Sequence, residues 1–196
     1  MWRRLLEIDI QIAGEVRAAG CTHCAGVLHG ARYPRKPRGV PRALLGEDYE
    51  HRLSLCCSVE GCRRRSTPAS VRFLGRRVYL GAVVLVLSAL SHGLSARRCA
   101  ELENRYGVSE RTLRRWRHWW QVLLPRTPWW GQARARWVVA PREREMPASL
   151  LERFGESVDG AVLSAALGFV SPCSLSSFDA LRDGRTAPAQ EATAAG

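Results

Sequence analysis

Apolar residues recur at helical spacing in the first twenty residues and again near residue 80. An amphipathic N-terminal helix over 1–20 is predicted by five of them: Leu5, Leu6, Ile8, Ile12 and Val16. The mostly apolar stretch Val78–Leu94 predicts a buried helix. Its uninterrupted part, Val78–Leu90, is 13 residues long and falls short of the ~20 residues that a membrane span needs. We therefore expect no membrane association.

Two further helices are predicted behind the apolar one, with a tight turn between them. Ser95 is a suitable N-cap for a helix that reaches about Arg105, and Gly107 accepts the left-handed backbone of a turn. Ser109 is then the N-cap of the next helix. Three apolar residues of that helix recur at i, i+3 and i+7 and form its inward stripe: Leu113, Trp116 and Trp120. Residues 77–124 are thus predicted to form a helix-turn-helix bundle.

The remaining segments complete an α+β, mainly α, fold class. Within 21–76, His51–Cys56 alternates polar and apolar residues as a half-buried strand does, and Pro34, Pro37 and Pro41 mark the basic loop 35–38. A linker and short C-terminal helices are predicted over 125–185, where the apolar positions of two helices can dock on the bundle or on a partner: Leu150, Leu151, Phe154, Val162, Leu163, Ala166, Leu167 and Val170. We expect these helices to mediate homodimerisation, and 186–196 to be a disordered tail.

Four cysteines have the spacing of a structural zinc site. Cys21 and Cys24 form a C-x2-C turn, and Cys57 and Cys62 form a C-x4-C turn. Two tight turns that each offer two thiolates provide the tetrahedral ligand set that Zn²⁺ prefers. Since seven cysteines in a cytosolic protein stay reduced, metal is the expected role rather than disulfides. The segment 21–76 is therefore predicted to be a zinc ribbon.

Several alternatives to this ligand set remain open. Cys56 can replace Cys57, although the C-x4-C spacing favours Cys57. His23 or His29 can be a ligand, although a lone histidine near such a turn is more often a surface residue. The C-x2-C pair can also be a redox pair, but no βαβ pattern surrounds it. Cys99 and Cys173 have no nearby partner and are expected to be buried apolar residues.

The positive charge of the chain is concentrated in its middle. Residues 21–126 carry 20 Lys and Arg against 7 Asp and Glu, whereas the rest carries 10 against 11. Such a block favours a polyanionic partner, most often nucleic acid. The expected DNA contacts are nine residues of the third helix and of the segment behind Cys62: Ser109, Arg111, Thr112, Arg114, Arg115, His118, Arg63, Arg64 and Arg65.

The order of these motifs resembles the N-terminal DNA-binding part of bacterial insertion-sequence transposases and their small regulatory partners. The resemblance rests on Cys21–Cys24, Cys57–Arg65 and Gly107–Trp116, and covers about residues 21–121. It implies a sequence-selective, zinc-dependent module that binds double-stranded DNA, with a transposase encoded nearby as a candidate partner. Glu103 departs from the pattern, because such motifs place a small residue four positions before the turn glycine. We expect a rotated second helix or a wider helix crossing.

No catalytic centre is predicted. The 70 residues after Arg126 are too few for a transposase nuclease core, and their carboxylates are scattered. The chain is expected to be a cytoplasmic, nucleoid-associated regulator or transposition accessory. Two rivals are an RNA- or general nucleic-acid-binding protein, with Trp116, Trp119 and Trp120 exposed for base stacking, and a zinc-ribbon adaptor that docks on proteins.

Overall fold

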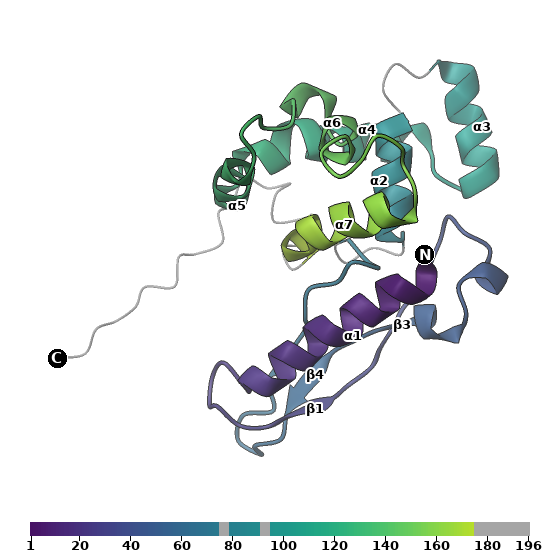
Figure 1. The fold of residues 1–196 in the computed structure, drawn as a ribbon. Coiled ribbons are helices and arrows are strands. Elements are labelled where there is room, and N and C mark those ends of the chain that lie inside the picture. Colours follow the sequence, from purple (N-terminus) through teal and green to yellow (C-terminus); the bar gives the residue numbers. More distant parts are fainter. Residues whose placement is uncertain (75–78, 91–94, 175–196) are drawn as a thin grey trace.

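The fold is α+β and mainly α, as predicted. A computed structural model describes residues 1–74, 79–90 and 95–174. The strands lie at one end of the molecule, and helices α3 and α4 lie at the other (Figure 1). The predicted disordered tail, 186–196, falls outside the described residues.

Helix α1 (Trp2–Ala19) lies alongside the strands and also contacts the helical body at α7. Its buried residues recur every fourth position, at Leu5, Asp9 and Ala13, so one stripe of the helix faces inward. Its N-terminal half packs on the main core, and Val16 packs on a small core beside the strands. The amphipathic helix was predicted, but the carboxylate in its buried stripe was not.

The strands are short and form two small sheets. Strands β1 (Leu28–Gly30), β4 (Leu55–Cys57) and β5 (Arg65–Ser66) form an antiparallel sheet in the order β1-β4-β5. Strand β2 (Tyr33–Pro34) pairs with β3 (His51–Arg52) in the other. Two 3-10 turns, Arg42–Leu44 and Glu47–Glu50, lie between β2 and β3.

The single strand expected over 51–56 is therefore wrong, because the chain changes sheet after Arg52. The side-chain alternation is also partly inverted. Arg52 and Ser54 are buried, whereas Leu53 is half-buried. Arg52 points inward because Nη2 donates hydrogen bonds to the carbonyl oxygens of Pro68 and Ser174, at 3.2 and 3.4 Å. Hydrogen bonds to buried carbonyl oxygens thus offset the cost of burying this polar side chain.

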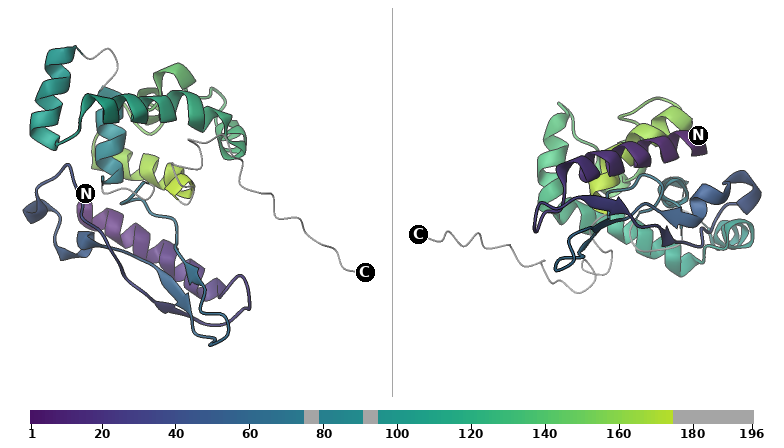
Figure 2. Two further views of the ribbon diagram at one scale, coloured as in Figure 1. Left: turned by 180° about the vertical axis from the view of Figure 1, so that it is seen from behind. Right: turned by 90° about the horizontal axis from the view of Figure 1, so that it is seen from below.

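The helical body starts with α2 (Gly81–Leu90), α3 (Ala96–Tyr106) and α4 (Glu110–His118). The predicted ends of the apolar helix, at 78 and 91–94, lie outside the described residues. A π-helical turn (Trp119–Leu123) and a 3-10 turn (Leu124–Arg126) continue α4. Three more helices follow: α5 (Pro128–Ala133), α6 (Ala148–Leu151) and α7 (Gly160–Val170). Helix α7 packs against both α1 and α2 (Figure 2).

The apolar faces of the C-terminal helices are buried in the core of this chain. The core includes Leu150 and Leu151 of α6 and Val162, Ala166 and Leu167 of α7, each at most 7% exposed. These side chains dock on the chain's own bundle, the first of the two possibilities that the sequence left open. They are therefore part of this chain's own core.

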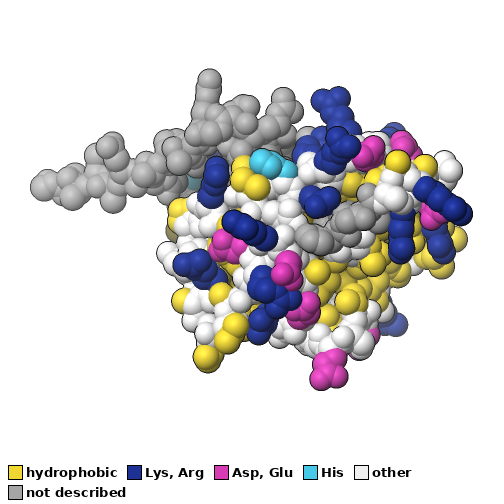
Figure 3. Space-filling model, turned by 90° about the horizontal axis from the view of Figure 1, so that it is seen from above, with side chains coloured by type: hydrophobic (Ala, Val, Ile, Leu, Met, Phe, Trp, Pro, Cys, Tyr) yellow, Lys and Arg dark blue, Asp and Glu magenta, His cyan; other side chains and the backbone are white. Residues whose placement is uncertain are grey.

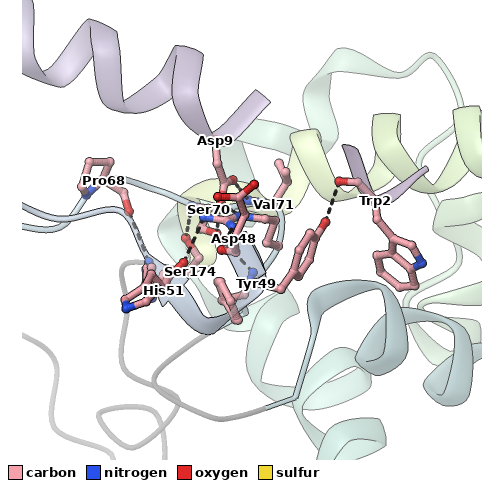
Figure 4. Close-up of polar contacts among 12 residues, drawn as sticks. Trp2, Asp9, Asp48, Tyr49, His51, Pro68, Ser70, Val71 and Ser174 are labelled. Carbon is pink, nitrogen blue, oxygen red and sulfur yellow. Dashed lines mark hydrogen bonds and ion pairs between the residues drawn. The ribbon is translucent and has the colours of Figure 1, made fainter. Parts of the chain in front are cut away.

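A buried polar network joins α1 to the segment that leaves the strands (Figure 4). The Asp9 carboxylate accepts three hydrogen bonds of 2.7 Å, from Ser70 Oγ, Val71 N and Arg72 Nε. Arg72 Nη1 also donates to the carbonyl oxygen of Asp48, at 2.8 Å. The amide of Ser70 donates to Ser174 Oγ, at 2.8 Å. The network fixes the segment 68–74 between α1 and the 3-10 turn (Ser171–Ser174) that follows α7.

Candidate metal centre and nucleic-acid interface

Four thiols converge at the end of the molecule that holds the strands. The Sγ atoms of Cys21, Cys24, Cys57 and Cys62 all lie within 4.8 Å of one another. The Cys21–Cys62 and Cys24–Cys57 sulfur distances are 3.8 and 3.4 Å. Four ligands at a Zn–S length of ~2.3 Å in a tetrahedron stand about 3.8 Å apart. The thiols are therefore positioned for a tetrahedral metal ion.

Two similar turns bring the thiols together. In the first, Cys21 N donates to Gly26 O at 2.9 Å, and Ala25 N donates to Cys21 O at 2.8 Å. In the second, Cys57 N donates to Arg64 O at 2.9 Å. The residue after the second cysteine has a left-handed backbone in both turns, with φ of 56° at Ala25 and 45° at Arg63. This conformation curls each turn back on its thiols, although neither residue is the glycine that accepts it most easily.

The two turns are packed closely at Gly26. A Cβ atom there would lie 2.5 Å from Val59 Cγ2, 3.2 Å from Cys57 Sγ and 3.3 Å from Cys24 Sγ. Only a residue without a side chain lets the first turn approach the second to this distance. Gly26 therefore positions the site, although the spacing of the thiols gives no sign of its role.

The structure separates the cysteine pair 56 and 57. The Cys57 side chain is fully buried in the thiol cluster, whereas Cys56 Sγ turns away and lies 3.6 Å from Arg63 O. Adjacent residues of β4 face opposite sides of the sheet, so only one can join the cluster. His23 and His29 are exposed and lie outside it. Cys99 and Cys173 are buried, as expected.

The thiols differ in acidity. Backbone N–H groups of His23 and Cys24 lower the pKa of Cys21 to about 7. Burial raises the pKa of Cys57. The backbone N–H groups of Gly26 and Arg64 lower the pKa of Cys24 and Cys62, but neighbouring thiols and burial outweigh them, so both values are raised. Cys21 is thus the thiol that deprotonates most readily.

At the opposite end of the molecule, α3 and α4 meet at a tight turn. Ser95 caps α3 by accepting a hydrogen bond from Arg98 N at 3.4 Å. Gly107 is left-handed, with φ of 64°, and its N–H donates to Glu103 O at 2.8 Å. These are the predicted cap and turn. Glu103 is exposed, and α3 turns Cys99 and Leu102 toward the body instead.

Helix α4 has one buried and one basic face. Leu113, Trp116 and Trp120 are buried, as the inward stripe predicted. Arg111, Arg114 and His118 are exposed, and Arg115 is half-buried. These four residues are spaced at i, i+3, i+4 and i+7, so they share one face. Arg114 forms an ion pair with Glu110, at 2.6 Å.

The start of α4 differs from the expected cap. Ser109 has the extended backbone of an N-cap, but its side chain makes no capping hydrogen bond. Ser109 Oγ instead lies 3.1 Å from Thr112 Oγ1, and both residues are half-buried. The two hydroxyls form a polar pair at the N-terminus of α4, beside the turn.

The tryptophans near the end of α4 are unavailable for base stacking. Trp116, Trp119 and Trp120 are at most 3% exposed. Trp119 and Trp120 pack edge to face with ring centroids 4.7 Å apart, and Trp116 packs on Tyr79. The form of the RNA-binding alternative that needs these rings at the surface is therefore wrong.

Among the described residues, the basic side chains do not form one continuous patch on the face drawn in Figure 3. Seen from the α3 and α4 end, Lys and Arg side chains are interspersed with acidic and apolar ones (Figure 3). Arg63, Arg64 and Arg65 are exposed, but they follow the second thiol turn at the far end of the molecule (Figure 1). They belong to a second basic cluster, separate from that of α4.

Part of the positive charge serves the fold. Arg52 and Arg72 are at most 4% exposed, and burial lowers the pKa of Arg52 to about 10. Among the other arginines, Arg134 pairs with Glu143, and Arg142 pairs with Glu145 and Glu152.

The sequence contains one signal for the buried network around Asp9. Asp9 occupies the same inward stripe as Leu5 and Ala13, where a carboxylate needs a buried partner.

Comparisons with protein-family models, with curated proteins and with solved structures find no match to this chain. Within 1–74, 79–90 and 95–174, no helix has the length and apolar character needed to cross a bilayer.

Proposed function

We propose that this protein is a zinc-dependent, sequence-selective DNA-binding module. The observation that carries the proposal is the exposed basic face of α4, which follows directly behind the left-handed Gly107 turn. A helix presented in this way, with its apolar stripe held by the preceding helices, has the arrangement of a recognition helix that enters the major groove.

The residues of α4 would make two kinds of contact, with phosphates and with base edges. The hydroxyls of Ser109 and Thr112 would donate to phosphates at the start of the helix. Arg111 is exposed, and no hydrogen bond or ion pair holds its side chain in the described part of the chain. It is therefore the first candidate for a bidentate contact with a guanine edge. Arg115 and His118 would extend the contact along the groove, and Arg114 would have to exchange Glu110 for DNA.

The metal in this proposal is zinc with a structural role. Four thiolates in two tight turns fit Zn²⁺, whose coordination by cysteine is tetrahedral and closed. When bound, the ion would link residues 21–26 to 57–64 and add its binding energy to the stability of the strands. Arg63, Arg64 and Arg65 follow this site and would contact DNA phosphates away from α4.

The biological setting that we propose is a mobile-element regulator or transposition accessory without a catalytic core. The support is the resemblance in motif order to the DNA-binding part of insertion-sequence transposases. A transposase encoded nearby would be the protein partner, and the duplex the main ligand. Homodimerisation stays a proposal with no helix face assigned to it.

The deciding experiment is selection from a random duplex pool with zinc-loaded protein at ~150 mM salt, where purely electrostatic binding is weak. We expect an enriched motif, and its symmetry reports the number of copies bound. Tight binding at low salt without enrichment would make the protein a nonspecific anchor. The absence of duplex binding at any salt concentration would favour a protein-docking adaptor.

A further inference from the structure

We propose that the basic loop, residues 35–38, is a second DNA-contacting element that grips phosphates beside the site read by α4. This inference rests on the proposed function. The loop lies between β2 and the first 3-10 turn, far from the helix-turn-helix in sequence. Its place in the fold, however, is next to that motif.

A short chain of contacts links the loop to the turn before α4. Arg38 forms a parallel β-bridge with Tyr79. Tyr79 Oη donates a hydrogen bond of 3.0 Å to the carbonyl oxygen of Gly107. The Tyr79 ring also packs edge to face on Trp116, with ring centroids 5.1 Å apart. Tyr79 thus places Arg38 one side chain away from the turn.

The loop is also fixed against α2. Gly39 has φ of +92°, and a Cβ atom there would lie 2.8 Å from Val83 Cγ1. Pro37 is buried between the exposed residues Lys36 and Arg38. In two views of the molecule, the segment between β2 and β3 rises to the end of α3 where the turn begins (Figures 1 and 2). The backbone of the loop is therefore held in place before any ligand binds.

The charge of the loop suits phosphates. Residues 31–42 contain five basic residues and no acidic one: Arg32, Arg35, Lys36, Arg38 and Arg42. Lys36 and Arg38 are exposed, and in the described part of the chain neither side chain is held by a hydrogen bond or an ion pair. Arg114 on α4 is, by contrast, paired with Glu110. Two exposed cations on a backbone segment that is held in place beside α4 are suited to positioning the duplex, without reading its sequence.

The test compares two double variants of the zinc-loaded full chain on the selected duplex. In Lys36→Ala/Arg38→Ala the loop loses two charges. In the control, Arg17→Ala/Arg136→Ala, the same charge is lost from the last turn of α1 and from the segment behind α5, both exposed and away from the α3 end. Affinity is measured by fluorescence anisotropy as a function of salt concentration.

We expect the slope of log K against log salt to become about 1.8 units shallower in the loop variant, since each phosphate contact contributes about 0.9. Raising the salt from 50 to 200 mM should then weaken the wild type about tenfold more than this variant. The preferred motif should stay unchanged. The control variant should keep the wild-type slope, and trimming the flank on the loop side should bring the wild type to the level of the variant.

Gly39→Ala provides an independent test, because it displaces the loop from Val83 and leaves the charge unchanged. We expect a loss of affinity and of slope in the same direction, in protein whose circular dichroism spectrum is native. A loop variant with wild-type slope, or equal losses in the loop and control variants, would overturn the inference while the enriched motif still upholds the proposed function. A wild type that binds no duplex would overturn both.

Discussion

Asp9 and Arg72 form an ion pair of 2.7 Å in which the two side chains are 2% and 0% exposed. Asp9 lies in the middle of α1, and Arg72 lies in the segment that leads from the strands to the helical body. Each side chain also binds backbone groups. Asp9 accepts a hydrogen bond from the amide of Val71, and Arg72 donates to the carbonyl oxygens of Asp48 and His51. The pair therefore joins α1 to the segment that connects the strands to the helical body.

Removing one partner of this pair should destabilise the protein strongly. Asp9→Asn leaves the Arg72 guanidinium buried without a counter-charge, and we expect a loss of about 3–5 kcal/mol in the free energy of unfolding. Urea denaturation followed by circular dichroism measures it. The matched control is Glu7→Gln in the same helix, which breaks the exposed Arg3–Glu7 pair and should cost less than about 1 kcal/mol. Equal costs for the two substitutions would contradict the structural role of Asp9.

The adjacent cysteines of β4 give a matched pair for the metal site. Cys57→Ser removes a thiolate from the cluster, so we expect the purified variant to lose its zinc and the native fold of the strands. Cys56→Ser changes a thiol outside the cluster and should retain one zinc ion per chain. Elemental analysis of the purified proteins and thermal melts decide the matter. A zinc-loaded Cys57→Ser variant would show that the ligand set is wrong.

Zinc binding should release protons in a number that depends on pH. At pH 7.5, Cys24, Cys57 and Cys62 are protonated because their pKa values are raised, whereas Cys21, with a pKa of about 7, is already mostly thiolate. Where the two turns are already folded when the ion binds, coordination by four thiolates should therefore release about three protons at pH 7.5 and close to four below pH 6, where Cys21 is protonated as well. Calorimetry in buffers of different ionisation enthalpy counts them. A release of only one or two protons would mean that fewer thiols bind the ion.

Arginines on the exposed face of α4 should determine the preferred sequence. We expect Arg111→Ala and Arg115→Ala each to cost about 1–3 kcal/mol on the selected duplex and to relax the base preference at one position, if their forks contact guanine edges. Arg136→Ala, outside this surface, serves as the control for lost charge. Competition binding with duplexes that carry single base changes gives both quantities. Unchanged affinity in both α4 variants would remove these residues from the interface.

Local features of this fold could be predicted from the sequence. The cap at Ser95, the left-handed Gly107 and the stripe of Leu113, Trp116 and Trp120 all act within one or two helical turns. The C-x2-C and C-x4-C spacings likewise identified the four clustered thiols, because the backbone geometry of each turn is local.

Contacts between distant residues could not be predicted in the same way. Asp9 and Arg72 are far apart in the chain, so the sequence does not show that they pair. From the sequence alone, the buried Arg52 and Arg72 cannot be told from surface arginines. The apolar faces of α6 and α7 were visible in the sequence, but a partner protein and the chain's own bundle present the same apolar surface to them. The position of loop 35–38 depends on Tyr79 and Val83. No periodic pattern in the loop predicts these contacts.

The hydrogen bonds to Ser174 have a consequence for protein synthesis. Ser174 Oγ accepts from Ser70 N, and its carbonyl oxygen accepts from Arg52, 104 and 122 residues earlier in the chain. On the ribosome, the first turns and the strands emerge long before Ser174 does, so a nascent chain has to keep Arg52 hydrated until the turn after α7 arrives. Translation that stalls within α7 should therefore leave a thiol-bearing segment that can already take up metal but cannot yet close its interior.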